Sequence, residues 1–420
     1  MVNKLPVALA KYSFGVGDRF AHQARAQLKA IMKAQNMGIL ITPVWNKSYR
    51  EHSIIKSEPF ETRIQADNAV KSLGWEDVYF VDADHVAMNT VDYFLQSCDF
   101  FTLDVADFIG KRASEGDIND FVEKNKKYIG NFQVPGVDEN LTVQIEHIKV
   151  IAQKYLFAAQ EAGRIYKKIL EKKNPNSFVV EVSMDETDLP QSPLEIFFIL
   201  SALSQEQIPV HTLAPRFSGR FNKGIDYVGD LDRFKKEFTQ DVAVLQFAIK
   251  EFSLPQNLKL SVHSGSDKFS IYPIIKEVLR KYDSGLHIKT AGTTWLEELI
   301  GLALAGGAGL AIAKDIYVQS LNRFDELCKP YATVIDIDKK RLPAKDEVQQ
   351  WDGETFANAL RHNPTEKRYN PNFRQLLHVG YKIAAEMKSE YFTVLEKYAE
   401  IIAQNVMDNI YQRHIKPLFL

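Results

Sequence analysis

The sequence predicts an α/β protein, namely a closed (β/α)8 TIM-type barrel with a helical C-terminal extension. Three observations favour this fold. Eight short β-rich runs lie before residue 300, a helix-patterned stretch follows most of them, and no strand signal follows Trp351. Strands that alternate with helices pair in parallel through right-handed crossovers. The alternative is an open doubly wound sheet, which would need a cofactor crevice where the strand order reverses.

The expected strands are rich in β-branched and aromatic residues and end at turn-forming residues. They are YSFGVG at Tyr12, GILITPV from Gly38, DVYFVDA from Asp77, DFFTLDV from Asp99, SFVVEVS from Ser177, IPVHTLA from Ile208, LKLSVHS from Leu258 and LHIKTAG from Leu286. The expected helices span residues 21–35, 62–72, 141–172, 193–205, 231–252, 273–282 and 295–305. Eight such units fit a (β/α)8 barrel.

The barrel is expected to occupy residues 1–310. The polar segment at 110–140 is interpreted as an insertion after the fourth strand. Residues 311–420 form a mainly helical extension that packs on the barrel or contacts a second copy of the chain, and ATVIDID near Val334 carries the last strand signal. The apolar run at 299–313 is shorter than the roughly 20 residues that span a bilayer, so we expect it to form a buried helix.

Composition excludes several functional classes. The 420 residues carry a net charge of -2, which gives no electrostatic basis for binding nucleic acid or an anionic membrane. Cys98 and Cys328 have no metal-ligand or redox spacing, and the apolar N-terminal stretch is too short for a signal peptide. A reduced, cytoplasmic setting is therefore expected.

Polar side chains cluster where the predicted strands end, and barrel enzymes place their active sites at that end. The cluster comprises Asp18, Arg19, Asp82, Asp84, His85, Asp104, Glu181, Asp185, Glu186, His211, Arg216, His263, Ser264, Asp267, Lys268, Lys289, Thr290 and Thr293. His85 and His263 lie among carboxylates, so we expect them to bind a divalent cation: zinc, manganese, nickel or cobalt. His211 and His287 are expected to be structural, and His378 either caps the site or packs in the helical extension.

Two carboxylates in this group suit proton transfer. Glu181 lies in an apolar strand, where burial needs a cation, a metal or a proton and favours the neutral acid. Asp84, beside a predicted ligand, is expected to stay ionised and act as a base. The GVGDRF motif at Gly15 lacks the third glycine of a dinucleotide fingerprint, and the sequence has no Walker loop and no serine nucleophile elbow.

Fixed positive charge accompanies these groups. Arg19, Arg216, Lys268 and Lys289 follow strands, and HIKTAGTTWLEE opens a helix whose first amides could bind an anion. A pocket that combines metal ligands, carboxylates and cations suits a small polyhydroxylated acid.

Seven motifs resemble those of the bacterial tagaturonate/fructuronate epimerases, which are metal-dependent barrel enzymes of hexuronate breakdown. The motifs are GVGDRF, DADHV, EVSMDETDLPQSP, RFSGRFNKGIDYVGDL, HSGSDKFSIYP, HIKTAGTTWLEE and RQLLHVGYKIAAE, in order from Phe14 to Glu386. Members of that family usually carry an extra N-terminal segment that this sequence lacks.

The resemblance implies Asp84 as proton acceptor and Glu181 as proton donor. It implies His85 and His263 as metal ligands, with His378 as a candidate for the third. The substrate would be a hexuronate. The residues expected to bind it are Asp18, Arg19, Arg216, Ser264, Asp267, Lys268 and Lys289.

The implied reaction constrains the mechanism. The two keto acids differ at carbon 3, which is β to the ketone at carbon 5, so enolisation cannot invert that centre. Transient oxidation by a nicotinamide is one route, which the missing fingerprint disfavours. Retro-aldol cleavage and re-addition is the other, and it needs a base, an acid and a cation. The alternatives are a metal-dependent sugar-acid isomerase or aldolase, and a non-catalytic sugar-acid binding protein.

Overall fold

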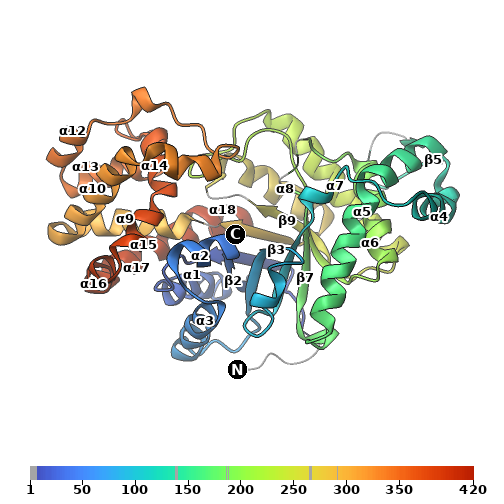
Figure 1. The fold of residues 1–420 in the computed structure, drawn as a ribbon, viewed down its shortest axis with the longest axis horizontal. Helices are drawn as coiled ribbons and strands as arrows, with labels where there is room; N and C mark the ends of the chain where they lie inside the picture. Colours follow the sequence, from blue (N-terminus) through green and yellow to red (C-terminus); the bar gives the residue numbers. More distant parts are fainter. Residues whose placement is uncertain (1–6, 138–140, 186, 188, 264–266, 291) are drawn as a thin grey trace.

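Eight parallel strands close into a barrel in the computed structural model, which describes residues 7–420 except 138–140, 186, 188, 264–266 and 291 (Figure 1). The strands are β1 (Tyr12–Gly17), β2 (Ile41–Ser48), β3 (Phe80–Val86), β4 (Phe100–Asp104), β7 (Val179–Ser183), β8 (Val210–Ala214), β9 (Lys259–His263) and β10 (Leu286–Thr290). Their order around the barrel is β1-β10-β9-β8-β7-β4-β3-β2. All eight predicted strands are confirmed, and the closed sheet rules out the open alternative.

Helices surround the barrel, and their ends follow local signals in the sequence. They are α1 (Ala24–Gln35), α2 (Tyr49–Ile55), α3 (Pro59–Leu73), α5 (Ile145–Leu170), α6 (Pro193–Gln205), α7 (Leu231–Glu251), α8 (Tyr272–Tyr282) and α9 (Thr293–Ala305). Helix α6 starts as predicted because Ser192 and Glu195 form a capping box around Pro193. Helix α2 was not predicted, although Ser48 and Glu51 form a capping box there as well.

The polar segment after β4 folds as a small unit of its own beside α5 and α6 (Figure 1). It contains α4 (Glu115–Asn125) and two short antiparallel strands, β5 (Gly130–Phe132) and β6 (Leu141–Val143). The helix predicted to start at Leu141 therefore starts later, at Ile145, because the preceding residues pair with β5.

The C-terminal part is helical, and it packs against one side of the barrel (Figure 1). Its helices are α10 (Gly307–Asn322), α11 (Phe324–Cys328), α12 (Lys345–Gln350), α13 (Gly353–Leu360), α14 (Pro371–Val379), α15 (Tyr381–Met387), α16 (Ser389–Lys397), α17 (Ala399–Asp408), the π-helix η8 (Asn409–Ile415) and α18 (Lys416–Phe419). Helix α17 lies along α9 and α1, so the extension shares the barrel's apolar core.

Two predictions in this part are wrong. The apolar run at 299–313 forms two helices rather than one, because Gly306 has a φ of 68° and a ψ of −164°, a backbone conformation that ends α9. Residues 332–338 form no strand. Two of their amides bond to side chains instead: Asp336 N donates to Gln375 Oε1 at 2.9 Å and Asp338 N to Asn372 Oδ1 at 2.8 Å.

The barrel interior is divided into an apolar and a charged end. Val7, Leu9, Phe80, Phe100 and Val179 belong to a buried cluster near the strand starts, and the N-terminal segment is fixed there by a 3.0 Å hydrogen bond from Val7 N to Asn176 O. Polar and charged side chains occupy the opposite end, so the fold leaves that end for chemistry. Among the described residues, the structure has no helix long and apolar enough to cross a membrane.

Candidate active site

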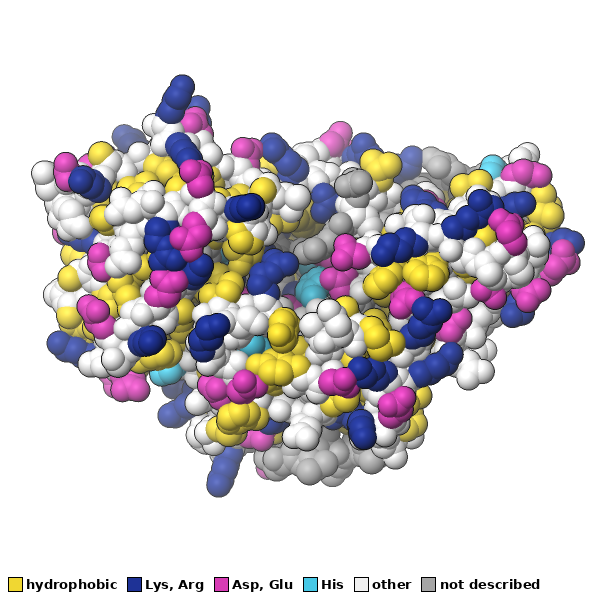
Figure 2. All heavy atoms as spheres, in the orientation of Figure 1, with side chains coloured by type: hydrophobic (Ala, Val, Ile, Leu, Met, Phe, Trp, Pro, Cys, Tyr) yellow, Lys and Arg dark blue, Asp and Glu magenta, His cyan; other side chains and the backbone are white. Residues whose placement is uncertain are grey.

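A histidine lies beside basic and acidic side chains in a hollow at the centre of the face shown in Figure 2. On β3, Asp82 and Asp84 lie two residues apart and therefore share the inward face of the strand. The register between β3 and β4 shifts between Ala83 and Val86, and His85 has a φ of 53°. This irregularity turns His85 into the same space as Asp84, where a regular strand would point it to the opposite face.

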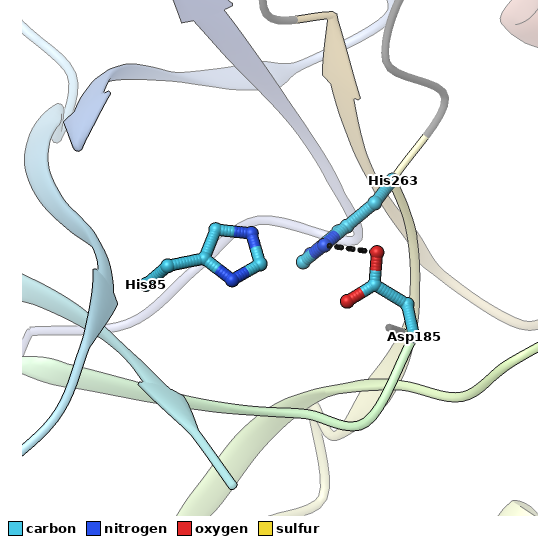
Figure 3. Close-up of side chains that lie close together, drawn as sticks. All are labelled: His85, Asp185 and His263. Atoms are coloured by element: carbon cyan, nitrogen blue, oxygen red, sulfur yellow. Dashed lines mark ion pairs between the residues drawn. The ribbon is translucent and has the colours of Figure 1, made fainter. Parts of the chain in front are cut away.

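His85, Asp185 and His263 converge in this space from the ends of β3, β7 and β9 (Figure 3). One ligand atom from each lies within 4.8 Å of the other two. The Nδ1 atom of His263 is buried and lies 3.2 Å from Asp185 Oδ2, and among the described residues it has no hydrogen-bond partner. Two imidazoles and a carboxylate around an unsatisfied nitrogen suit a divalent cation of the zinc, manganese, nickel or cobalt type.

The other nitrogen of each imidazole faces a carboxylate. His263 Nε2 lies 2.8 Å from Glu181 Oε1, and His85 Nδ1 lies 3.2 Å from Asp104 Oδ2. Metal-binding histidines usually donate their second N–H to such a group, which orients the ring and fixes its tautomer. These contacts leave Nδ1 of His263 and Nε2 of His85 as the ligand atoms. The residues present therefore fit a metal site.

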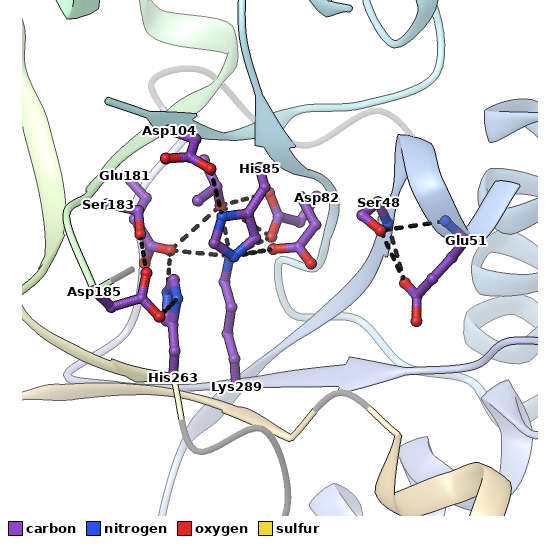
Figure 4. Close-up of polar contacts among 12 residues, drawn as sticks. Ser48, Glu51, Asp82, His85, Asp104, Glu181, Ser183, Asp185, His263 and Lys289 are labelled. Atoms are coloured by element: carbon purple, nitrogen blue, oxygen red, sulfur yellow. Dashed lines mark hydrogen bonds and ion pairs between the residues drawn. The ribbon is translucent and has the colours of Figure 1, made fainter. Parts of the chain in front are cut away.

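A buried ion cluster adjoins this group (Figure 4). Lys289 Nζ lies 2.8 Å from Asp82 Oδ2, 2.9 Å from Asp84 Oδ1 and 2.9 Å from Glu181 Oε1. Thr102 Oγ1 bonds to Asp82 at 3.0 Å and to Glu181 at 3.3 Å. One ammonium thus holds three carboxylates in fixed positions beside the histidines.

The pKa values in this cluster follow from Lys289 and the histidines. Burial raises the pKa of Asp82 to about 7, because Lys289 offsets only part of the cost of its charge. Burial acts in the same direction on Asp84 and Glu181, but Lys289 with His85 or His263 outweighs it and lowers both pKa values. The expectation that Glu181 is neutral is therefore wrong. Its apolar strand neighbours gave no sign of Lys289 and His263, which lie far away in the sequence.

Comparison with known proteins identifies the family to which the chain belongs. The tagaturonate epimerase (UxaE) family model matches residues 2–418. The chain belongs to the tagaturonate epimerase family. A tagaturonate/fructuronate epimerase from Thermotoga maritima is 29% identical over 420 aligned residues, which cover 96% of this chain and 80% of that protein.

Solved structures agree on the fold. A glycerol complex of the fructuronate-tagaturonate epimerase UxaE from Cohnella laeviribosi superposes with a TM-score of 0.80 at 23% identity, covering 99% of this chain and 83% of that one. The native crystal structure of that protein gives a TM-score of 0.77 at 23% identity, with the same coverage. This similarity extends over the barrel and the helical extension together.

Several predicted site residues of this family member have other contacts. Asp18 accepts hydrogen bonds from the backbone N–H groups of His22 and Gln23, at 3.2 and 2.6 Å, and so holds the start of α1. Arg216 donates to the backbone oxygen of Asp185 at 3.2 Å, which places it beside the His85–Asp185–His263 group. Ser264 and Glu186 lie outside the described residues.

Asp267 and Lys268 lie in a separate buried region. Asp267 pairs with Arg374 at 2.6 Å and with His414 at 3.1 Å, both from the C-terminal extension. Lys268 Nζ donates to the backbone oxygens of Asn222 and Ile225 at 2.9 and 2.7 Å. Neither side chain belongs to the His85–Asp185–His263 group or to the cluster of three carboxylates around Lys289.

Other histidines also differ in their surroundings. His211 accepts a hydrogen bond from Val180 N at 3.1 Å, and His287 pairs with Ser13 Oγ at 2.8 Å inside the barrel, as expected for structural residues. His378 was a predicted metal ligand, but among the described residues the group that could hold a metal is formed by His85, Asp185 and His263 without it. Its ring lies against Gly292 at the start of α9.

Sequence reasoning missed the part played by Asp185 as the third group beside the two histidines. Its position two residues beyond the β7 residue Ser183 was a usable signal, but in the sequence Asp185 stood out only as one member of the polar cluster. Thr102 carried no signal, because a threonine in a strand is ordinary. Its role comes from its register with Glu181 across β4 and β7.

Proposed function

We propose that this protein interconverts D-tagaturonate and D-fructuronate by metal-dependent retro-aldol and aldol steps. The observation that carries the proposal is the pairing of a His85–Asp185–His263 group with three carboxylates fixed around Lys289, in a member of the tagaturonate epimerase family. A divalent cation held by the histidines and Asp185 would polarise the ketone and offset the negative charge that develops on it.

Asp84 is assigned as the base. Its lowered pKa keeps it ionised at neutral pH, and its Oδ1 is held by Lys289 at 2.9 Å. Asp84 takes the proton of the carbon-3 hydroxyl. The carbon 3–carbon 4 bond then breaks, and its electron pair forms the enediolate of carbons 4 and 5 while carbon 3 becomes an aldehyde.

Rotation about the carbon 2–carbon 3 bond presents the other aldehyde face, and re-addition forms the opposite configuration. The new alkoxide then needs a proton, for which Glu181 is assigned as donor. Because its pKa is lowered, Glu181 must first receive that proton. Asp82, with a pKa of about 7, is a suitable source, since Thr102 bonds to both carboxyl groups. The proton that Asp84 took must return to Asp82 before the next turnover, and Lys289, which contacts both carboxylates, links them.

The test is NMR of the purified protein with tagaturonate in ²H₂O, with zinc, manganese, nickel or cobalt added singly and with a chelator as control. We expect fructuronate to form only with metal, without added nicotinamide and without deuterium at carbon 3. Deuterium at carbon 3 would contradict the retro-aldol route. Binding without turnover in every metal would favour a sugar-acid binding protein, and accumulation of three-carbon products would favour an aldolase.

A further inference from the structure

A second group of buried polar atoms lies at the start of α9, away from the metal ligands. Arg19, after β1, is 5% exposed, and its guanidinium stacks on Tyr381 with 4.2 Å between the guanidinium carbon and the ring centre. Its Nε lies 3.2 Å from Glu51 Oε1. Neither Nε nor Nη1 makes a hydrogen bond to any described residue. A buried guanidinium with unused N–H groups is costly unless a ligand completes it.

His378 on α14 lies beside Arg19 and is also incompletely bonded. It is 1% exposed, and its Nε2 has no hydrogen-bond partner among the described residues. Burial, followed by the positive charge of Arg19 and Lys223, holds the pKa of His378 well below its usual range. The ring is therefore neutral, and with its proton on Nε2 it offers one N–H donor.

Both side chains meet at Gly292. A Cβ atom built on Gly292 would lie 2.3 Å from His378 Nε2 and 3.0 Å from Arg19 Nη1, so the two nitrogens approach the same point. That point is the N-cap of α9, a helix of 13 residues whose first turn has no side-chain cap. The first N–H groups of a helix have no partner within the helix, and together with the positive end of the helix dipole they favour an anion there.

We infer that Arg19, His378 and the first turn of α9 form the subsite that holds the carboxylate of the substrate. This inference rests on the proposed function for the identity of the anion. A planar guanidinium suits a carboxylate because it can donate two parallel N–H bonds. Two of the other predicted cations are less suited, since Lys268 donates to carbonyl oxygens and Lys289 is already surrounded by carboxylates.

The subsite has a specific task in retro-aldol chemistry. Cleavage between carbons 3 and 4 leaves the carboxylate on carbon 1 of the aldehyde half, while carbons 4 to 6 form the enediolate of dihydroxyacetone. No covalent bond then joins the halves. An anchor at carbon 1 retains the aldehyde half and still permits rotation about the carbon 2–carbon 3 bond. The subsite thus makes the enzyme an epimerase rather than an aldolase.

The experiment compares Arg19→Met, Arg19→Lys and His378→Gln with the control Arg50→Met, which removes an exposed arginine of α2. For Arg19→Met we expect KM for tagaturonate to rise about 10- to 100-fold, as for loss of a charged hydrogen bond. Dihydroxyacetone should also be released at a measurable rate. Arg19→Lys should recover part of the affinity, His378→Gln should show a smaller rise in KM, and Arg50→Met should match the wild type.

Two inhibitors separate this inference from the proposed function. Glycerate mimics the carboxylate half, and dihydroxyacetone mimics the neutral half. Arg19→Met should weaken glycerate binding, measured by calorimetry, and leave dihydroxyacetone binding unchanged. If the wild type is inactive but binds glycerate, and Arg19→Met weakens that binding, the proposed function is wrong and the anion subsite is supported. An active Arg19→Met variant with unchanged KM and glycerate affinity would overturn the subsite and keep the function.

Discussion

Single residues determine the charge balance of the barrel mouth, and Lys289 has the largest effect. Its ammonium lies within 2.9 Å of Asp82, Asp84 and Glu181, all of them buried. A buried carboxylate without a cation is costly, and it responds by taking up a proton. The ionisation of the proposed base therefore depends on a residue from a strand on the other side of β1 and β2.

We expect Lys289→Met to lower kcat by at least about 100-fold, because Asp84 and Glu181 become protonated at neutral pH. Their folded pKa values should then lie above the unfolded values. The folded state of this variant should therefore be most stable at low pH, and its stability should fall as pH rises through the new pKa values of Asp84 and Glu181. Urea unfolding between pH 5 and 8 measures this dependence. Lys345→Met, which removes an exposed lysine of α12 outside the cluster, should not show this pH dependence.

The carboxylates themselves can be tested by isosteric changes. Asp84→Asn and Glu181→Gln keep the side-chain shape, and each should reduce kcat by about 10²–10⁴-fold with little change in KM. Metal content is measured in parallel by elemental analysis. Near-wild-type kcat with normal metal content would assign the residue a structural role, and Asp185 would then be the next group to examine.

Metal binding should depend strongly on pH. Without an ion, burial disfavours the charged imidazoles, but Asp84 and Asp185 outweigh this and raise the pKa of His85 to about 10 and that of His263 to about 9. Both rings are therefore positively charged at pH 7, and each must lose one proton before a ring nitrogen can bind a cation. We expect close to two protons released per ion at pH 7 and affinity that increases with pH. Calorimetry in buffers of different ionisation enthalpy counts the released protons. A count of zero would contradict metal binding by His85 and His263.

At the scale of secondary structure elements, the break between α9 and α10 depends on one backbone conformation. Gly306 has a φ of 68° and a ψ of −164°, which glycine tolerates and other residues adopt only with strain. Nothing lies within 4 Å of the position of a Cβ there, so any effect of a methyl group comes from the backbone.

We therefore expect Gly306→Ala to lower the free energy of unfolding by about 1–3 kcal/mol. Gly116→Ala is the matched control, because Gly116 lies in α4 with a normal helical backbone and no close contact, and alanine favours a helix. Denaturant titration of both variants separates backbone strain at position 306 from the general effect of replacing glycine by alanine. Equal stability of the two variants would show that the Gly306 conformation is not what ends α9.

At the scale of the whole molecule, Asp267 joins the barrel to the helical extension. It follows β9, is fully buried, and pairs with Arg374 of α14 and His414 of η8. Removing one partner of a buried ion pair leaves an uncompensated charge, which costs about 3–5 kcal/mol. The extension is thus coupled to the strand that carries His263.

We expect Arg374→Met to reduce stability by that amount and to weaken metal binding through His263. The double variant Asp267→Asn/Arg374→Met should be more stable than the sum of the single changes predicts. Urea unfolding and metal titration measure the two effects. Strict additivity would mean that the two side chains do not interact across the junction.

The sequence by itself determined the fold class and most of the elements. Alternation of eight strands with helices specified the barrel, and the helix predicted at 193–205 coincides with α6. It also indicated His85 and His263 as partners, because strand ends in a parallel barrel meet at one end. These features depend on local patterns and on a topology with few alternatives.

Only the tertiary structure decided how the polar groups pair. It joined Lys289 to three carboxylates, brought Asp185 to the histidines, and placed Asp267 and Lys268 in a different cluster. Such pairings depend on strand register and on a turn such as that at His85, which no periodicity in the sequence records. The pKa of Glu181 was mispredicted for the same reason, since Lys289 and His263 are distant in the sequence but lie 2.9 and 2.8 Å from its carboxylate.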